Sequence, residues 1–327
     1  MKKILFACML AVFSLSTAFA ADQAPSGKGL RIWFDAGGSP GESYTETVVK
    51  GAQQAAIDLG VELKLVYSDW QPEKMLQNFK NGLANRPSGL VVMGHPGDDA
   101  YAPLIDEAFA EGMAVTAIDT DLPVIREKYK SRGFGFVGPD DWARGADMAR
   151  EILRRNSFGK GSRAMVWGFS SMENRGRSTR ATIEELRKAG MEVDDIEISD
   201  EINKDISLGA PVLSGYLTSH PDCKLIVVDH GALTGQMENF LKSAGFEADS
   251  VYVAGFSLSE TALDAVKSGY LDLVGDVQPY LVGYGGVLQV VQTVRFGFSG
   301  LNVDTGGGFL SKENLQELVP LVKQGIR

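Results

Sequence analysis

The stretch from Met113 to Asp121, MAVTAIDTD, constrains the fold more than any other part of the chain. Its apolar run has the length and the branched side chains of a β-strand that is buried on both faces, which is typical of a parallel sheet covered by helices. The run ends abruptly at two carboxylates, Asp119 and Asp121. In parallel α/β sheets, ligands bind outside the carboxyl ends of the strands. The two carboxylates therefore either cap the next helix or face a ligand.

The alternation of a short apolar strand with an amphipathic helix recurs about ten times along the chain. Strands are predicted near residues 30–34, 61–67, 90–93, 113–118, 134–137, 164–167, 193–198, 225–228, 251–254 and 271–274. Short connections between such units predict parallel sheets with helices on both faces. A single barrel needs eight strands, so ten fit two sheets better. The length of 327 residues also favours two domains over a single core.

The first twenty residues predict a secretory signal peptide. Lys2 and Lys3 precede an apolar run, and Ala18-Phe19-Ala20 fits a small-residue cleavage site, so we expect cleavage after Ala20. The run is too short to span a membrane, and no later stretch reaches about 18 uninterrupted apolar residues. Removal of the signal leaves Cys223 as the one cysteine. No internal disulfide is therefore expected, and Cys223 is interpreted as a small buried hydrophobe.

The charge of the chain excludes several classes of partner. The formal net charge is −10, and it becomes −12 once the two lysines of the signal peptide are removed. No basic cluster is present that could follow a phosphate backbone, so nucleic acid and anionic membrane surfaces are poor partners. A net charge of this size favours a soluble protein, which we expect to be a monomer.

Polar side chains follow several predicted strands at the point where each strand ends. They are Asp35 after the first strand, His95 after the third, Asp119 and Asp121 after the fourth, Asp229 and His230 after 225–228, Ser257 after 251–254 and Asp276 after 271–274. Each one alone can be explained as a helix cap or a solvated loop residue, but their recurrence at one edge of the sheets favours a ligand site. Arg177 lies close to a helix start, where a cation is unfavourable, so we interpret it as facing the ligand.

These residues do not assemble into a catalytic or metal-binding constellation. His95 and His230 lack the close spacing of metal ligands, and the chain has neither a Gly-x-Ser-x-Gly elbow nor a phosphate-binding loop. The segment GFGFVG at 133–138 matches the dinucleotide pattern, but its glycines lie within the strand rather than between a strand and a helix. We therefore expect no cofactor and no metal, with an exported enzyme acting on a small carbohydrate as the alternative function.

A neutral ligand rich in hydroxyl groups suits the polar strand ends. A carboxylate accepts hydrogen bonds from two hydroxyls, and an arginine fork donates to ring or hydroxyl oxygens. An aromatic face can cover the apolar side of a sugar ring. The aromatic residues in or near these loops are Tyr44, Trp142, Phe169, Phe256 and Tyr280.

Several longer motifs resemble one known family. They are LVVMGHPGDDA at 90–100, VTAIDTD at 115–121, FVGPDDWARG at 136–145, HPDCKLIVVDH at 220–230, VAGFS at 253–257 and DVQPYLVG at 276–283. In order and spacing the chain resembles the periplasmic substrate-binding proteins of sugar-importing ABC transporters, of the ribose- and galactose-binding type. A sugar-responsive transcription regulator shares this architecture but begins with a DNA-binding helix pair, where this chain has a predicted signal peptide.

The resemblance implies a type I periplasmic binding protein fold, in which two similar lobes are joined by three chain crossings, here near Gly138, Val277 and Asp304. The N-terminal lobe would comprise 29–138 and 278–304, and the C-terminal lobe 139–277 and 305–327. It also implies a periplasmic protein that closes on a sugar or sugar alcohol by a hinge motion and delivers it to a membrane permease. Delivery to a chemoreceptor is a further alternative.

The ligand contacts of the family correspond most clearly to Asp119, Arg177 and the pair Asp229-His230. Tyr44 stands where a stacking aromatic residue is usual, and Asn203 or Lys204 where another contact is expected. The full set of candidate ligand-binding residues is Asp35, Glu42, Tyr44, His95, Asp119, Asp121, Arg177, Asn203, Asp229, His230, Ser257, Asp276 and Gln278. The chain departs from the family pattern at Gly94-His95, Thr120, Ser257 and Val277, so neither ribose nor galactose is assumed.

Overall fold

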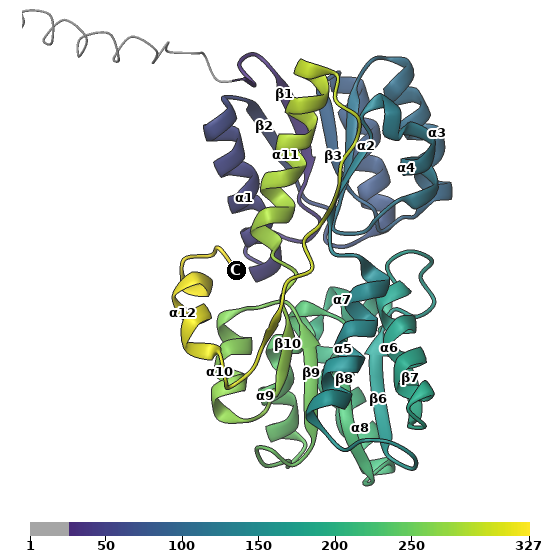
Figure 1. Ribbon diagram of the computed structural model, residues 1–327, viewed down its shortest axis with the longest axis vertical. Coiled ribbons are helices and arrows are strands. Elements are labelled where there is room, and N and C mark those ends of the chain that lie inside the picture. The colour runs from purple at the N-terminus through teal and green to yellow at the C-terminus, as the bar shows by residue number, and fades with distance from the viewer. Residues whose placement is uncertain (1–25) are drawn as a thin grey trace, which may run out of the picture.

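The computed structural model describes residues 26–327, so the predicted signal peptide and its cleavage site lie outside the described residues. The described chain forms two α/β lobes, one above the other in Figure 1, each built on a six-stranded sheet. The predicted fold class, two doubly wound parallel-sheet lobes joined by three crossovers, is confirmed. None of the described helices is both long and apolar enough to cross a membrane.

The sheet of the N-terminal lobe has the strand order β11-β5-β4-β3-β1-β2, and all its neighbouring strands run parallel. Its strands are β1 (Arg31–Asp35), β2 (Glu62–Val66), β3 (Gly89–Met93), β4 (Ala114–Ile118), β5 (Gly135–Gly138) and β11 (Asn302–Asp304). The helices of this lobe are α1 (Ser43–Leu59), α2 (Pro72–Asn85), α3 (Asp98–Ala110), α4 (Pro123–Tyr129) and α11 (Pro279–Phe296), with a 3₁₀ turn at Lys130–Arg132.

The sheet of the C-terminal lobe has the order β12-β10-β9-β8-β6-β7, in which only the short strand β12 runs antiparallel to its neighbour. Its strands are β6 (Arg163–Gly168), β7 (Glu192–Glu197), β8 (Cys223–Val228), β9 (Tyr252–Phe256), β10 (Leu273–Gly275) and β12 (Phe309–Leu310). Its helices are α5 (Asp141–Arg155), α6 (Arg177–Lys188), α7 (Asp200–Lys204), α8 (Gly209–Ser219), α9 (Gly231–Ser243), α10 (Glu260–Ser268) and α12 (Leu315–Lys323), with a 3₁₀ turn at Ile206–Leu208.

The chain crosses between the two sheets three times. The first crossing joins β5 to α5, the second joins β10 to α11, and the third joins β11 to β12. Residues near the C-terminal end of the chain thus complete the N-terminal lobe, since α11 covers one face of its sheet and β11 forms its edge (Figure 1).

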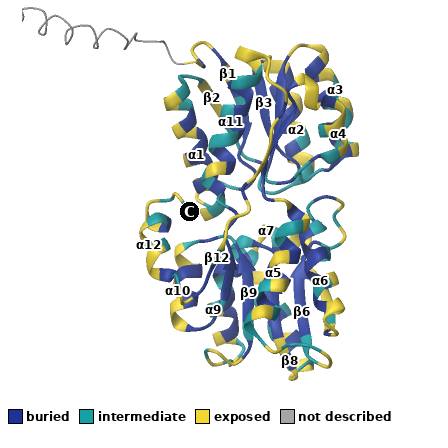
Figure 2. Ribbon diagram, in the orientation of Figure 1, coloured by how far each residue is buried: buried dark blue, intermediate teal, exposed yellow. Residues whose placement is uncertain are grey.

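Apolar packing on both faces of each sheet stabilises the two lobes. Every residue of β3 and β4 is buried, as the continuous apolar runs predict for central parallel strands. One core of the N-terminal lobe joins the sheet to α1 and α11, and another joins it to α2, α3 and α4. Figure 2 shows buried strands inside each lobe and exposed residues on the outer sides of the helices.

Two glycines let α11 lie unusually close to α1. A Cβ atom on Gly283 would stand 1.9 Å from the carbonyl oxygen of Val48, and one on Gly51 would stand 2.0 Å from the carbonyl oxygen of Tyr280. Both obstacles are backbone atoms, which cannot move aside as a flexible side chain can. The contact between these two helices therefore requires that both positions lack a side chain.

We expect Gly283→Ala to lower the free energy of unfolding by about 1–3 kcal/mol, because the added methyl group forces the two helices apart. The matched control is Gly215→Ala in α8, where an added Cβ would have no atom within 4 Å. This control should be stabilising by about 0.5–1 kcal/mol, because glycine is unfavourable inside a helix. Chemical denaturation measures both variants, and equal unfolding free energies would contradict the close helix contact.

Candidate ligand-binding site between the lobes

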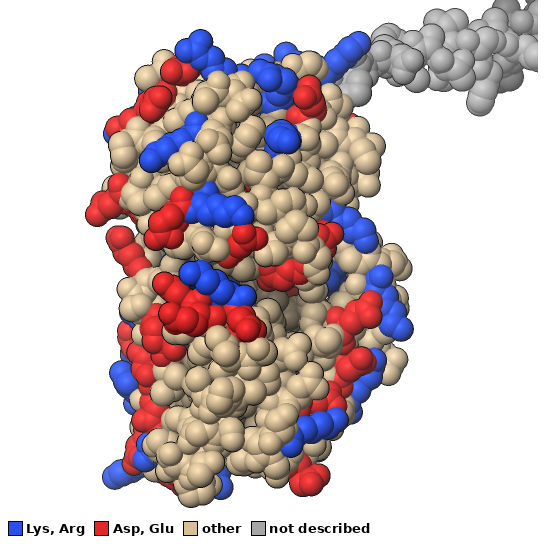
Figure 3. Space-filling view, turned by 180° about the vertical axis from the view of Figure 1, so that it is seen from behind, with Lys and Arg blue, Asp and Glu red and all other residues tan. Residues whose placement is uncertain are grey.

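A cavity of about 280 Å³ lies at the boundary between the two lobes. Both lobes and the second crossing line this cavity. From the N-terminal lobe come Glu42, Tyr44, Trp70, Pro72, His95 and Asp119, and from the second crossing comes Val277. From the C-terminal lobe come Arg144, Phe169, Ser171, Met172, Arg175, Glu197, Ile198, Ser199, Asp200, Asn203, His230, Gly231 and Ser257. Small-molecule pockets span about 300–1,000 Å³, so this cavity suits a small ligand. The surface is hollowed between the lobes, and acidic side chains gather along that boundary (Figure 3).

Asp119 reaches the cavity because the backbone turns sharply where β4 ends. Its φ angle is +64°, in the left-handed region that aspartate adopts more readily than most residues. The hydroxyl group of Tyr44 donates a hydrogen bond to the Asp119 carboxylate. The other carboxylate oxygen lies 3.5 Å from Nε2 of His95. The carboxylate is therefore held in place while it remains on the cavity wall.

His95 and His230 enter the cavity from opposite lobes, and both are neutral at pH 7. Burial lowers the pKa of His95 to about 4, and burial likewise lowers the pKa of His230 to about 4. His230 begins α9, where its Nδ1 atom accepts a hydrogen bond from the backbone N–H of Leu233 at 3.3 Å. Nδ1 is thus unprotonated, and Nε2–H donates to Oδ1 of Asn203 at 3.0 Å. These hydrogen bonds fix the side chains of His230 and Asn203 on the cavity wall.

Aromatic side chains line both sides of the cavity. In the N-terminal lobe, the Trp70 ring lies 5.8 Å from the Tyr44 ring and 5.4 Å from the His95 ring. The indole N–H of Trp70 donates to the Glu42 carboxylate at 2.6 Å, and burial raises the pKa of Glu42. Phe169 lies on the C-terminal side. Such surfaces can cover the apolar face of a sugar or cyclitol ring while the carboxylates accept hydrogen bonds from its hydroxyls.

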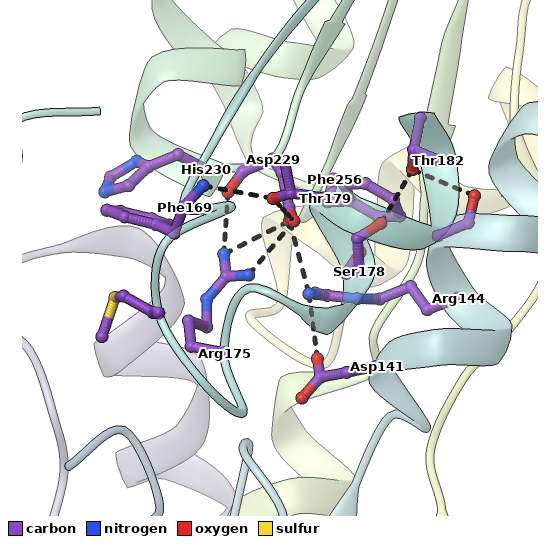
Figure 4. Close-up of polar contacts among 12 residues, drawn as sticks. Asp141, Arg144, Phe169, Arg175, Ser178, Thr179, Thr182, Asp229, His230 and Phe256 are labelled. Carbon is purple, nitrogen blue, oxygen red and sulfur yellow. Dashed lines mark hydrogen bonds and ion pairs between the residues drawn. The ribbon is translucent and has the colours of Figure 1, made fainter. Parts of the chain in front are cut away.

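Asp229 forms the centre of a buried ion cluster beneath the cavity (Figure 4). Arg175 donates to both carboxylate oxygens at 3.2 Å and to the carbonyl oxygen of the same residue at 2.7 Å. Arg144 approaches at 3.3 Å, and the hydroxyl of Thr179 donates at 2.8 Å. Burial would raise the pKa of Asp229, but Arg175 and Arg144 outweigh it and hold this pKa below its usual range. The carboxylate therefore stays ionised.

The two arginines are also held by their other neighbours. The Arg175 guanidinium lies 5.0 Å from the Phe169 ring centre, and the Arg144 guanidinium lies 4.7 Å from that of Phe256. Arg144 further pairs with Asp141 at 3.0 Å. Burial raises the pKa of Asp141 to about 7, against the opposing effect of Arg144. Both cations are thus largely compensated within the protein.

The structure brings part of the predicted set together on the cavity wall, and this part comprises Glu42, Tyr44, His95, Asp119, Asn203, His230 and Ser257. Asp229 lies just behind the wall, where it holds the two arginines rather than facing the cavity. Ser257, like Asp119, has a left-handed φ angle, of +71°, directly after its strand.

The other acidic candidates are corrected by the structure. Asp35 turns inward and accepts hydrogen bonds from the N–H of Gly37 at 2.9 Å, from Ser68 at 2.9 Å and from Asn78 at 3.0 Å. Burial raises the pKa of Asp35 to about 6. Asp121 is away from the cavity because it pairs with Arg126 at 2.8 Å. Both residues stabilise loops of the N-terminal lobe instead of lining the cavity.

Asp276 and Gln278 belong to the second crossing and not to the cavity wall. Asp276 pairs with Arg327 at 2.7 Å and accepts a hydrogen bond from the backbone N–H of Gln278. Gln278 has a φ angle of +52°, and its side chain donates to the carbonyl oxygen of Thr305 at 3.0 Å. The Gln278 bond joins the second crossing to the third, and the Asp276 ion pair joins the second crossing to Arg327, so both side chains are structural.

Arg177 is also corrected, because the arginines on the cavity wall are Arg144 and Arg175. The sequence predicts a helix start close to Arg177, and α6 begins at that residue, so 169–176 is a loop that places Arg175 in the cavity. Within residues 26–327, the Arg177 side chain makes no hydrogen bond or ion pair. Gly176, directly before the helix, is the signal in the sequence that could have marked this boundary. Trp70 was also missed, because it follows a weakly buried edge strand.

Comparison with known proteins gives matches over most of the chain. The family model for the periplasmic binding protein domain matches residues 37–297. In sequence, the chain is 24% identical over 284 residues to a xylose/arabinose-binding protein of Sulfolobus acidocaldarius, a match that covers 81% of this chain and 67% of that protein.

Solved structures share the fold. A carbohydrate transporter protein from Acidothermus cellulolyticus, in complex with myo-inositol, has a TM-score of 0.77 and 19% identity over 91% of this chain and 99% of its own. An ABC transporter solute-binding protein from Burkholderia graminis, in complex with D-arabinose, has a TM-score of 0.77 and 20% identity over 88% of this chain and 97% of its own.

We expect Arg175→Ala to lower the free energy of unfolding by about 3 kcal/mol, because removing one partner of a buried ion pair leaves the other charge uncompensated. The loss lies at the low end of the usual range because Arg144 and Thr179 still contact Asp229. Arg177→Ala is the matched control and should cost less than about 0.5 kcal/mol. Chemical denaturation measures the free energy of unfolding of both variants. A larger loss for Arg177→Ala than for Arg175→Ala would refute the placement of Arg175 in the buried ion cluster.

The stability of the protein should depend on pH through His230. The pKa of His230 is lowered to about 4 in the folded protein, so between pH 6.5 and 4 the unfolded chain binds a proton that the folded protein does not. The stabilisation that neutral His230 gives the folded protein is fully present above pH 6.5 and is lost as the pH falls toward 4. Relative to His230→Asn, which retains a capping oxygen, the unsubstituted protein should lose up to roughly 3 kcal/mol by pH 4. Denaturation curves at several pH values test this, and parallel pH profiles would argue against it.

Proposed function

The chain belongs to the periplasmic binding protein family, and on this premise we propose that it captures a neutral monosaccharide or polyol between its lobes and delivers it to an ABC importer. The match to the family model over residues 37–297 confirms the family that the sequence motifs indicated. Proteins similar to this one in sequence or fold include a xylose/arabinose-binding protein and structures in complex with myo-inositol and with D-arabinose.

The observation that carries the proposal is the small cavity to which both lobes contribute hydrogen-bonding groups and aromatic surface. Asp119 and Glu42 offer carboxylate oxygens from one lobe, and Asn203 offers an amide from the other. The charges of Arg144 and Arg175 are offset by Asp229, by Asp119 on the cavity wall and in part by Asp141, so they do not create an excess of positive charge. An anionic ligand would meet the carboxylates without a free cation, and a neutral hydroxyl-rich ligand avoids that repulsion.

The remaining parts of the proposal follow from the family and the sequence. We infer export to the periplasm with cleavage after Ala20, a monomeric mature protein, and a membrane permease as the partner that receives the ligand. We propose a binding protein and not an enzyme, because the matching family is one of binding proteins and both ring nitrogens of His230 are engaged, with Asn203 and with the backbone N–H of Leu233. Delivery to a chemoreceptor remains a second use of the same ligand-bound form.

A thermal-shift screen over pentoses, hexoses, deoxy sugars and cyclitols tests the ligand class. A ligand at about one hundred times its dissociation constant stabilises the folded protein by about 2.7 kcal/mol. We expect at least one neutral sugar or cyclitol to do so, and the corresponding sugar acids to have no effect. Stabilisation by the acids alone would contradict the proposed ligand class, and the absence of any stabilising compound would contradict sugar capture.

Asp119→Asn should weaken the binding of the sugar or cyclitol that the screen identifies by about 10- to 150-fold, because hydrogen bonds to a charged group are worth about 1.5–3 kcal/mol. Asparagine keeps the size of the side chain and tolerates the left-handed backbone angle at this position. The matched control is Asp121→Asn, because Asp121 is held by Arg126 outside the cavity. Titration calorimetry measures both variants, and equal affinities would place the ligand elsewhere.

A further inference from the structure

We propose that Asp98 and Asn174 form a latch between the lobes, which positions the arginine-bearing loop 169–176 over the ligand and holds the closed conformation. The proposal rests on the proposed function, because it assigns to this pair a role in capture. Neither residue lines the cavity, so their effect on the ligand would be indirect. Both are positioning residues.

The latch is a direct hydrogen bond from one lobe to the other. Asn174, in the loop between β6 and α6, donates from Nδ2 to Oδ2 of Asp98 at 3.0 Å. Asp98 is the first residue of α3 in the opposite lobe. Asp98 is 4% exposed and Asn174 is 6% exposed, so the bond is shielded from water. A shielded bond to a carboxylate is strong, and the same carboxylate without its partner would be costly to bury.

Asp98 is fixed within its own lobe before the lobes meet. Its second oxygen, Oδ1, accepts a hydrogen bond from the backbone N–H of Ile125 at 2.9 Å, which ties α3 to α4. A carboxylate in the first turn of a helix is also stabilised by the helix dipole. One carboxylate oxygen therefore serves the N-terminal lobe, and the other is presented to the C-terminal lobe.

The loop that carries Asn174 is held as a rigid unit on α6. Arg180 donates from Nη1 to the carbonyl oxygens of Ser170 and Met172, each at 2.7 Å. The backbone N–H of Phe169 donates to Thr179 at 3.1 Å, and the N–H of Gly176 donates to the carbonyl oxygen of Met172 at 3.1 Å. Because these bonds hold the loop as one rigid segment, anchoring Asn174 to the N-terminal lobe also fixes the position of the cavity residues on the same loop.

Those cavity residues include Phe169, Met172 and Arg175. The latch therefore couples two events, the approach of the lobes and the placement of an aromatic ring and a guanidinium group against the ligand. Because the bond forms only when the lobes are together, it favours the closed conformation. The apparent affinity for a ligand scales with the population of the conformation that binds it, so loss of the latch should weaken binding without removing any ligand contact.

The test uses two substitutions at Asn174 and one rescue. Asn174→Ala removes the donor, and Asn174→Asp places a second carboxylate against Asp98. The double variant Asp98→Asn with Asn174→Asp reverses the donor and the acceptor, and an asparagine at position 98 can still accept from Ile125. Glu184→Gln is the control, because Glu184 is an exposed residue of α6 that lies outside the cavity and pairs with Lys188 of the same helix. Chemical denaturation first establishes that each variant folds.

Titration calorimetry and stopped-flow kinetics are then performed with D-arabinose, D-xylose and myo-inositol, using each compound that binds the unsubstituted protein. We expect Asn174→Ala to raise the dissociation constant by about 10- to 100-fold, chiefly through faster dissociation, as for a lost hydrogen bond to a charged group. Asn174→Asp should weaken binding more than Asn174→Ala, because two carboxylates then face each other. The double variant should return to within about threefold of the unsubstituted protein, and Glu184→Gln should leave binding unchanged.

Solution scattering of the sugar-bound proteins supplies a readout that a merely structural role would not change. At a sugar concentration that saturates the unsubstituted protein, Asn174→Asp should show a larger radius of gyration, and the double variant should not. Unchanged affinity in both single variants, or failure of the double variant to recover affinity, would overturn the latch. If no compound of the thermal-shift screen bound the unsubstituted protein, that result would instead overturn the proposed function, and the role of the latch in capture with it.

Discussion

The cavity depends on the buried carboxylate of Asp229. A carboxylate removed from water is unfavourable unless charged or polar partners compensate it. Here the compensation comes from three elements, since Arg144 belongs to α5, Arg175 to the loop before α6, and Thr179 to α6 itself. Arg144 is further held by Asp141 and Phe256, and Arg175 is further held by Phe169. The C-terminal wall of the cavity is therefore ordered before any ligand arrives, and a wall ordered in advance lowers the entropy lost on binding.

Most of the fold could be predicted from the sequence because the central strands are buried on both faces. Such strands appear as continuous apolar runs, and β3, β4 and β8 have this character. The helices and strands that were not predicted lack such a continuous apolar run. The edge strand β11 is fully exposed, and β12 has only two residues, so neither produces an apolar run. The short helix α4 begins at a proline and has two buried residues, which leaves little periodicity to detect.

The candidate site was predicted only in part, because strand ends are visible in the sequence and the direction of a side chain is not. Asp35 and Asp119 both end strands, yet one turns inward to Gly37 and Ser68 while the other faces the cavity. The left-handed backbone angle at Asp119 directs its side chain to the cavity, and that angle depends on packing around the end of the strand. Arg175 was missed because the sequence does not show which of the arginines near a helix start turns toward the cavity, whereas contacts with Asp229 and Phe169 fix the direction of Arg175 in the structure.

The origin of β11 and α11 near the C-terminal end has a consequence for how the protein is made. A nascent chain that has been synthesised only as far as β10 already contains five strands of the N-terminal lobe. It still lacks the valines that α11 adds to the core of that lobe, namely Val282, Val287, Val290 and Val291. Contacts between residues so distant in sequence form late and slow folding. The first lobe therefore stays incomplete until synthesis is nearly finished, although five of its six strands are made first.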